Sequence, residues 1–269
     1  MTGVALGPWD GLLAQCRTDQ CDVWVDGILR AMSAERGGSV PFEVRATNGE
    51  RYWVKQVENP QSARSPITEQ VIAGCGRLIG APVREVRLIV IPEELDGETL
   101  SSGVVLRHGI AHASLNLEYS SFDKTWGPEN RSLDDNRRRH AAYFAFFDWC
   151  WGADPQWLYD TTDDMKLYSH DHGHFLPGSP DWNVESLLGN CEVAHSLDTS
   201  PEGLDYNELE RVAVILENLT AAELKGVLCG IPASWPVSDR ELETLGFFLD
   251  SRRVPVARRI QQLAATLAR

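Results

Sequence analysis

The stretch from residue 144 to residue 175 constrains the fold of this chain more than any other part of the sequence. Its first half is aromatic and apolar, and it stops abruptly at Gly152-Ala153-Asp154-Pro155, where glycine and proline disfavour a continuing helix. A buried helix is therefore expected to deliver Asp154 to a loop. The run 165–169 that follows has strand character and leads into a histidine-rich turn. This pattern predicts that Asp171 lies at the end of a strand.

Two carboxylates on neighbouring loops, each at the end of a packed element, suit phosphoryl transfer. One carboxylate orients or deprotonates the attacking hydroxyl, and the other holds magnesium against the phosphates of the nucleotide. A purely structural interpretation is also available, because Asp154 could start a turn before Pro155 and Asp171 could be a turn residue beside Gly173. The spacing alone leaves both interpretations open.

The composition is that of a soluble globular protein, with 43% hydrophobic and 24% charged residues among 269. A chain of this length forms one large domain or a bilobal one. The formal net charge of −14 argues against direct binding of nucleic acid or of an anionic membrane. No basic flank or long apolar core marks the N-terminus, and no long uncharged apolar run occurs elsewhere. We therefore expect a cytoplasmic protein.

The six cysteines are scattered along the chain without a Cys-x-x-Cys pair or a regular spacing. This pattern argues against a zinc site and against a disulfide framework. Free thiols in a reducing cytoplasm are the expectation.

The first third of the chain has the pattern of a small sheet. Residues 42–46 and 51–55 alternate at period two around an Asn-Gly pair, which predicts a β-hairpin that ends at Lys55. The hairpin is preceded by a turn, Gly37-Gly38-Ser39. Residues 22–30 could form an edge strand or a helix, and further strands are expected over 82–92 and 103–107.

A helix is expected over residues 67–79, because apolar residues recur at helical spacing and Gly80 ends the pattern. Glu69 lies in its first turn, where a carboxylate is favoured by the helix dipole. Residues 111–128 read as a polar connection, and the remaining helices are expected over 136–151, 208–218, 220–228 and 239–268. The prediction is an α+β fold with a mostly antiparallel N-lobe over residues 1–110 and a helical C-lobe over residues 111–269.

The order of these parts is that of protein-kinase-like phosphotransferases: a Gly-rich turn, a strand lysine, a helix glutamate and two spaced aspartates. In that arrangement, backbone N–H groups of the turn cover the phosphates. The lysine neutralises the phosphate charge and the glutamate holds the lysine in place.

The chain resembles the HipA-like kinase domain family from about residue 30 to about residue 255. The resemblance rests on Gly37-Gly38-Ser39-Val40-Pro41, Tyr52-Trp53-Val54-Lys55, Thr68-Glu69, Gly80-Ala81-Pro82-Val83-Arg84-Glu85-Val86, Phe147-Asp148, Ala153-Asp154, Ser169-His170-Asp171-His172-Gly173-His174, Pro232-Ala233-Ser234-Trp235 and Arg252-Arg253.

The resemblance implies a bilobal protein-kinase-like fold that uses ATP and Mg²⁺. It implies that Gly37, Gly38 and Ser39 cover the nucleotide, and that Lys55 contacts its α- and β-phosphates while Glu69 pairs with Lys55. It also implies that Asp154 is the catalytic base or hydroxyl-orienting residue and that Asp171 is a magnesium ligand.

The loop after Asp154 departs from the family pattern. Family members usually carry an asparagine about five residues after the catalytic aspartate as a second metal ligand, and this position is Tyr159 here. A phenol binds magnesium poorly at neutral pH, so Asp160 beside it is the predicted substitute. Pro155 follows Asp154 in place of a basic residue, and Val40 replaces the lysine of the turn.

The sequence thus predicts a kinase that transfers phosphate from ATP to a hydroxyl of an unidentified protein or small molecule. One alternative is a nucleotide-binding pseudokinase that acts as an interaction module. Another is a kinase-fold protein that carries out other chemistry in specialised metabolism.

Overall fold

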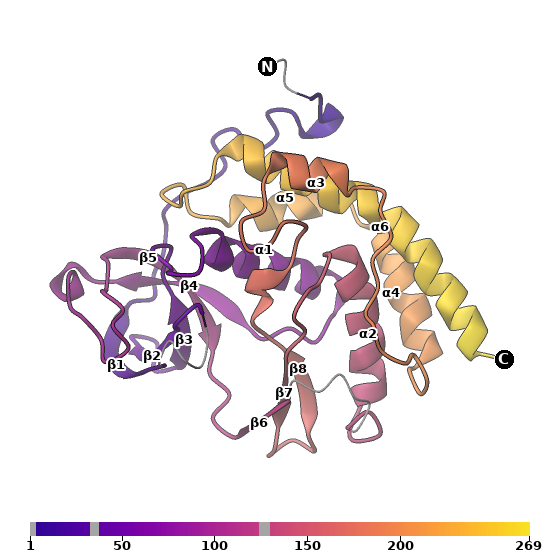
Figure 1. Cartoon of the computed structure of the whole chain (residues 1–269), viewed down its shortest axis with the longest axis horizontal. Helices are drawn as coiled ribbons and strands as arrows, with labels where there is room; N and C mark the ends of the chain where they lie inside the picture. Colours follow the sequence, from indigo (N-terminus) through magenta and orange to yellow (C-terminus); the bar gives the residue numbers. More distant parts are fainter. Residues whose placement is uncertain (1–3, 33–37, 124–129) are drawn as a thin grey trace.

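The computed structural model describes residues 4–32, 38–123 and 130–269. Gly37 of the expected turn and residues 124–129 of the expected connection lie outside the described residues. Figure 1 shows a sheet at one side of the molecule and long helices at the other, with a smaller sheet between them. The predicted order, an antiparallel sheet followed by a helical region, is confirmed.

The N-terminal sheet has five strands in the spatial order β1-β2-β3-β5-β4, and each neighbouring pair is antiparallel. Its strands are β1 (Val25–Ala31), β2 (Phe42–Ala46), β3 (Arg51–Lys55), β4 (Val86–Ile91) and β5 (Gly109–Leu115). The predicted hairpin of β2 and β3 is confirmed, and the undecided N-terminal segment forms strand β1.

The prediction of a strand over residues 103–107 is wrong. The backbone there bonds locally instead, since Leu100 N donates to Val104 O and Gly103 N to Leu100 O, each at 2.8 Å. The fifth strand is β5, most of which lies within the segment that the sequence suggested was a polar connection.

The two faces of the N-terminal sheet have different roles. Tyr52 and Val54 point into a small hydrophobic core on one face of the sheet. Because side chains alternate along a strand, Arg51, Trp53 and Lys55 lie on the opposite face. Lys55 thereby faces α1 (Arg64–Ile79). The predicted helix is confirmed, and it ends before Gly80, whose φ of 73° is left-handed. It begins at Arg64, earlier than expected, so the prediction that Glu69 lies in its first turn is wrong.

A second sheet has the order β6-β7-β8, with β6 (Ser120–Asp123), β7 (Trp157–Asp160) and β8 (Lys166–Ser169). Strand β8 was expected and β7 was not, because β7 directly follows a proline-containing turn. Trp157 and Tyr159 are buried in the main core, whereas Leu158 and Tyr168 lie on the partly exposed face. This sheet positions the loops before β7 and after β8.

Helices form the rest of the described chain: α2 (Asn136–Trp149), α3 (Val184–Gly189), α4 (Tyr206–Asn218), α5 (Ala221–Cys229) and α6 (Asp239–Leu267). The sequence predicted each of them except the short α3. Helix α6 starts at a capping box of Ser238 and Glu241 and continues through Pro255. Among the residues that the structure describes, no helix combines the length and apolar composition needed to cross a membrane.

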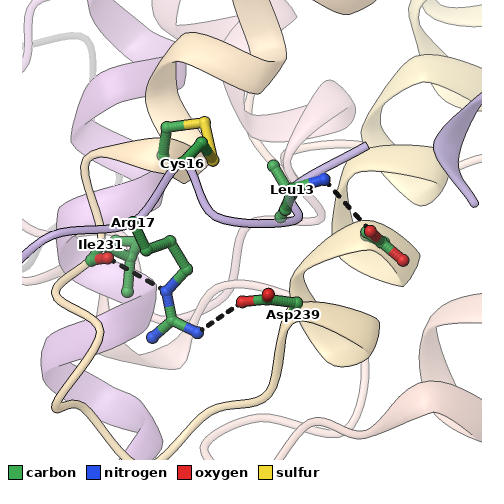
Figure 2. Close-up of a disulfide and its surroundings, with 7 residues drawn as sticks. Leu13, Cys16, Arg17, Ile231 and Asp239 are labelled. Carbon is green, nitrogen blue, oxygen red and sulfur yellow. Dashed lines mark hydrogen bonds and ion pairs between the residues drawn. A yellow bond between two sulfur atoms is a disulfide. The ribbon is translucent and has the colours of Figure 1, made fainter. Parts of the chain in front are cut away.

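The N-terminal segment lies across the C-terminal helices, and a disulfide joins Cys16 to Cys229 at the end of α5 (Figure 2). The expectation that all cysteines are free is therefore wrong for this pair, whereas Cys21, Cys75, Cys150 and Cys191 are free thiols. The two partners are 213 residues apart in sequence, so no local spacing could reveal them. Arg17 reinforces the attachment through Ile231 O at 3.1 Å and Asp239 at 3.0 Å (Figure 2).

Candidate active site

The centre of the site is a buried lysine held by two carboxylates. Lys55 Nζ lies 2.5 Å from Glu69 Oε1 and 2.7 Å from Asp171 Oδ1. Burial would lower the pKa of Lys55, but the charges of Asp171 and Glu69 outweigh it and raise that pKa. Burial would likewise raise the pKa values of Glu69 and Asp171, and Lys55 lowers both below their usual range. All three groups are therefore charged at neutral pH.

The pH range over which this cluster stabilises the fold follows from the directions of the pKa shifts. Because the pKa values of Glu69 and Asp171 are lowered, their stabilisation is present above the unfolded carboxyl pKa of about 4 and is lost as pH falls through the folded values. Because the pKa of Lys55 is raised, its contribution is complete below about pH 10 and is lost only as pH rises through the folded value. The stabilisation from the cluster is therefore complete from about pH 5 to pH 10.

A histidine that the sequence did not indicate supports the glutamate. His112 on β5 pairs with Lys55 on β3 in the strand register. Its Nε2 lies 3.2 Å from Glu69 Oε2, and its Nδ1 lies 3.0 Å from Gln70 Oε1. Both oxygens of Glu69 thus have a polar neighbour. No sequence signal marked His112, because the sequence placed it in a polar connection, whereas it lies on β5.

The two predicted aspartates share an uncommon backbone conformation. Asp154 has a φ of 46° and Asp171 a φ of 56°, in the left-handed region that aspartate adopts more readily than most residues. Such conformations cluster at functional sites because the surrounding structure must enforce them. Asp154 is exposed to solvent, whereas Asp171 is partly buried beside Lys55.

Gln156 connects the two aspartates. Its Nε2 donates to Asp154 Oδ2 at 2.9 Å and to Asp171 Oδ2 at 3.2 Å. The side chain is 6% exposed and directly precedes β7. The structure therefore brings Lys55, Glu69, Asp171 and Asp154 together, with Gln156 as a member that the sequence analysis missed.

Tyr159 and Asp160 do not join this group. Tyr159 is buried in the core. Asp160 lies opposite Lys166 at the far end of the β7–β8 pair, about 13 Å along the strand from Gln156. Its carboxylate accepts from the backbone and hydroxyl of Thr162 at 2.9 Å and 2.7 Å. Gln156, and not Asp160, is the side chain that stands beside Asp171.

The described part of the Gly-rich turn is connected to the site by contacts with the loop after β3. Asn59 Nδ2 donates to Ser39 O at 2.8 Å. A Cβ on Gly38 would lie 3.3 Å from Gln61 Nε2. Gln61 in turn contacts His174 across 2.5 Å between their Nε2 atoms. The turn, the loop after β3 and the loop of Asp171 are therefore neighbours.

The side chains present fit a magnesium ion that arrives with phosphates. Mg²⁺ is usually held by one or two carboxylates together with substrate phosphates. Asp171 provides one carboxylate, and Gln156 provides an amide that can turn its oxygen inward. Within the described residues, no group of three or more His, Cys, Asp or Glu side chains forms a ready cation cage. The phosphates would complete the coordination.

Comparison with a family model supports the predicted resemblance over part of the chain. Residues 25–154 match the family model of HipA-like kinases. The resemblance is thus confirmed over a range that contains Lys55, Glu69 and Asp154, and the Asp171 loop lies beyond it. The search of curated proteins gives no match.

The chain is also similar to solved kinase structures. The crystal structure of the Helicobacter pylori proinflammatory kinase CtkA aligns with a TM-score of 0.58 at 12% identity, over 90% of this chain and 97% of that chain. At this identity the likeness shows the protein-kinase-like fold. Crystal structures of the Golgi casein kinase, one of them with Mn/ADP bound, align with TM-scores of 0.47 at 10% and 11% identity, over 95% of this chain and 76% of those chains.

Gly173 lets the Asp171 loop approach α1. A Cβ at position 173 would lie 2.3 Å from Ser65 Oγ and 3.3 Å from Glu69 Oε1. We expect Gly173→Ala to displace Glu69 from Lys55 and to weaken nucleotide binding about tenfold, measured by calorimetric titration. Gly189→Ala is the matched control, because a Cβ there meets nothing within 4 Å. Equal binding by both variants would contradict the role of this close approach.

Proposed function

We propose that the protein is an ATP- and Mg²⁺-dependent kinase that transfers the γ-phosphoryl group to a hydroxyl of a protein or small molecule. The observation that carries this proposal is the contact of one buried lysine, Lys55, with both Glu69 and Asp171. This arrangement supports the proposal because it brings together three groups that phosphoryl transfer needs: a cation for the phosphates, a carboxylate that positions that cation, and a carboxylate for the metal ion.

Each residue has a role that follows from its contacts. The ammonium group of Lys55 has three donors, two of which meet Glu69 and Asp171, so one is available for a phosphate oxygen. Asp171 and the amide of Gln156 would hold the cation, which neutralises charge on the transferring phosphoryl group when bound. The exposed carboxylate of Asp154 accepts the proton or the hydrogen bond of the acceptor hydroxyl.

A nucleotide-binding protein without transferase activity is the second candidate. The loop after Asp154 favours it, because Pro155 replaces a basic residue and Tyr159 replaces the usual metal-binding asparagine. The two candidates share the nucleotide site and differ in whether ATP is consumed.

Calorimetric titration of the protein with ATP, with and without Mg²⁺, tests the nucleotide site. We expect Mg²⁺-dependent binding that is lost in Lys55→Met, because the variant leaves the charges of Glu69 and Asp171 unpaired and removes the phosphate contact. Lys225→Met on α5 is the matched control and keeps binding. Binding accompanied by ADP formation supports the kinase, binding without it supports the second candidate, and no binding by folded protein contradicts both.

A further inference from the structure

The disulfide of Cys16 and Cys229 connects the start of the chain to the end of α5, which packs against the helix that carries Glu69. Both half-cystines are partly exposed, whereas the free thiols of Cys75 and Cys150 are fully buried. Exposed disulfides are more easily reduced than buried structural ones and are more often labile or regulatory. A thiol reductant can therefore reach this bond in the folded protein.

The N-terminal segment, residues 4–20, has hydrogen bonds that do not depend on the disulfide. Arg17 donates to Ile231 O at 3.1 Å and to Val237 O at 2.8 Å. Leu13 N donates to Glu243 Oε1 at 3.1 Å (Figure 2). These bonds end on α6 and on the loop before it, and none of them ends on α5. Reduction is therefore expected to release α5 while the N-terminal segment stays in place.

Helix α5 is a short element with little buried surface of its own. It has nine residues, and only two of its side chains, Leu224 and Leu228, are buried. Gly226 in its second half is exposed and lowers its helix propensity. A helix of this length is marginal in water and depends on its packing for stability. We therefore expect the position of α5 to depend on the covalent bond at its last residue, Cys229.

Helix α5 packs closely against the part of α1 that follows Glu69. A Cβ on Gly74 of α1 would lie 2.5 Å from Val227 Cγ1, so Val227 of α5 lies against bare backbone of α1. One turn before Gly74, Gln70 lines a cavity of about 380 Å³ together with Val227. Gln70 Oε1 also lies 3.0 Å from Nδ1 of His112, whose Nε2 lies 3.2 Å from Glu69 Oε2. A displacement of α5 therefore alters the packing of the turn of α1 that carries Glu69.

We propose that the disulfide of Cys16 and Cys229 is a redox switch for the nucleotide site; this rests on the proposed function. In the oxidised state, the disulfide holds α5 against α1 and thereby supports the contact of Glu69 with Lys55. Reduction by a dithiol breaks the S–S bond: two electrons and two protons pass to the two sulfurs, which become thiols, and the dithiol is oxidised to its own disulfide. Helix α5 then moves away from α1 more readily, and the reduced protein binds nucleotide more weakly.

The test compares the oxidised full chain with the same protein after reduction by dithiothreitol. Calorimetric titration with ATP and Mg²⁺ is expected to show about tenfold weaker binding after reduction, within the usual range of coupling between two sites, and reoxidation should restore the affinity. Amide hydrogen exchange in α5 and in the adjacent turn of α1 should become faster. Cys16→Ser should bind like the reduced protein and should not respond to dithiothreitol. Cys191→Ser removes a partly exposed free thiol and is the matched control, which keeps the full response.

The outcomes separate this inference from the proposed function. If the oxidised protein does not bind ATP, the proposed function fails and the inference fails with it. If the oxidised and reduced proteins bind ATP equally well, or if binding weakens while exchange in α5 and α1 stays unchanged, the inference alone is overturned. If reoxidation does not restore the affinity, Cys16→Ser decides: weak binding by the folded variant supports the inference, and full affinity overturns it.

Discussion

Asp171→Asn is expected to lower Mg²⁺-dependent phosphoryl transfer by about 10³-fold or more, on the scale seen when a group that stabilises transition-state charge is removed. Asparagine has nearly the same shape and keeps an oxygen that can accept from Gln156. It lacks the charge that lies 2.7 Å from Lys55 Nζ and that would bind the cation. The loss should appear in the rate of ADP formation measured against Mg²⁺ concentration.

Asp160→Asn is the matched control for this experiment. The sequence suggested Asp160 as a metal ligand, but its carboxylate caps a turn through Thr162. We therefore expect Asp160→Asn to retain activity within about twofold, since the rest of the site is unaltered. Thermal unfolding of both variants checks that the fold is intact. A folded Asp171→Asn protein with full activity would remove Asp171 from the mechanism.

The sequence could predict the residues that local patterns place. Strand alternation suffices to place Lys55 on β3, and the helical spacing of apolar residues suffices to place Glu69 on a helix; the two are found in contact. The end of a strand sufficed for Asp171, because a turn that follows a short strand is encoded by adjacent residues. Each of these residues is placed on its element by neighbours in the sequence, which explains why the pattern was informative.

The parts that the sequence could not predict depend on contacts between distant segments or on altered loop length. Gln156 reaches both aspartates only because the loop after Asp154 enters β7 at once, whereas counting residues from the family pattern led to Tyr159 and Asp160. The disulfide of Cys16 and Cys229 joins opposite ends of the chain. Neither arrangement leaves a periodic signal in the sequence.

Arg252 on α6 supports the segment that leads to Asp154, and its substitution has the largest expected effect on the free energy of unfolding. Its guanidinium is 1% exposed and donates to Trp149 O at 3.0 Å, Asn190 O at 3.1 Å and Val193 O at 2.6 Å. It also pairs with the buried carboxylate of Asp148 at 3.1 Å. Helix α6 is thereby fixed to the end of α2, which leads into the loop of Asp154.

The same region leaves little room for adjustment around that loop. A Cβ on Gly152 would lie 2.2 Å from Phe147 Cδ2. His195 contacts Gly152 O at 2.6 Å and stacks between Phe147 and Trp151, with ring centroids 5.2 Å and 4.6 Å away. Trp151 also lies under the guanidinium of Arg252, 4.9 Å from it. A shift of Arg252 is therefore passed to the backbone that carries Asp154.

Arg252→Met is expected to lower the free energy of unfolding by about 3–5 kcal/mol, the range for removing one partner of a buried ion pair. Methionine fills much of the volume but donates no hydrogen bond, so several buried carbonyls lose their partner, at about 1–3 kcal/mol for each that stays unsatisfied. Arg259 remains beside Asp148 at 2.7 Å and limits the loss. Urea unfolding measures the difference between the variant and the unaltered protein.

Arg253→Met is the matched control, because Arg253 is the next residue on α6 and has the same side chain in a partly exposed setting. It pairs with Asp250 at 2.6 Å and donates to Glu217 O at 2.9 Å. Partly exposed ion pairs contribute about 0–1 kcal/mol, so the control should unfold within that range of the unaltered protein. Equal losses in the two variants would show that α6 is held mainly by its apolar face, and the loop of Asp154 would then owe its position to the aromatic packing around His195.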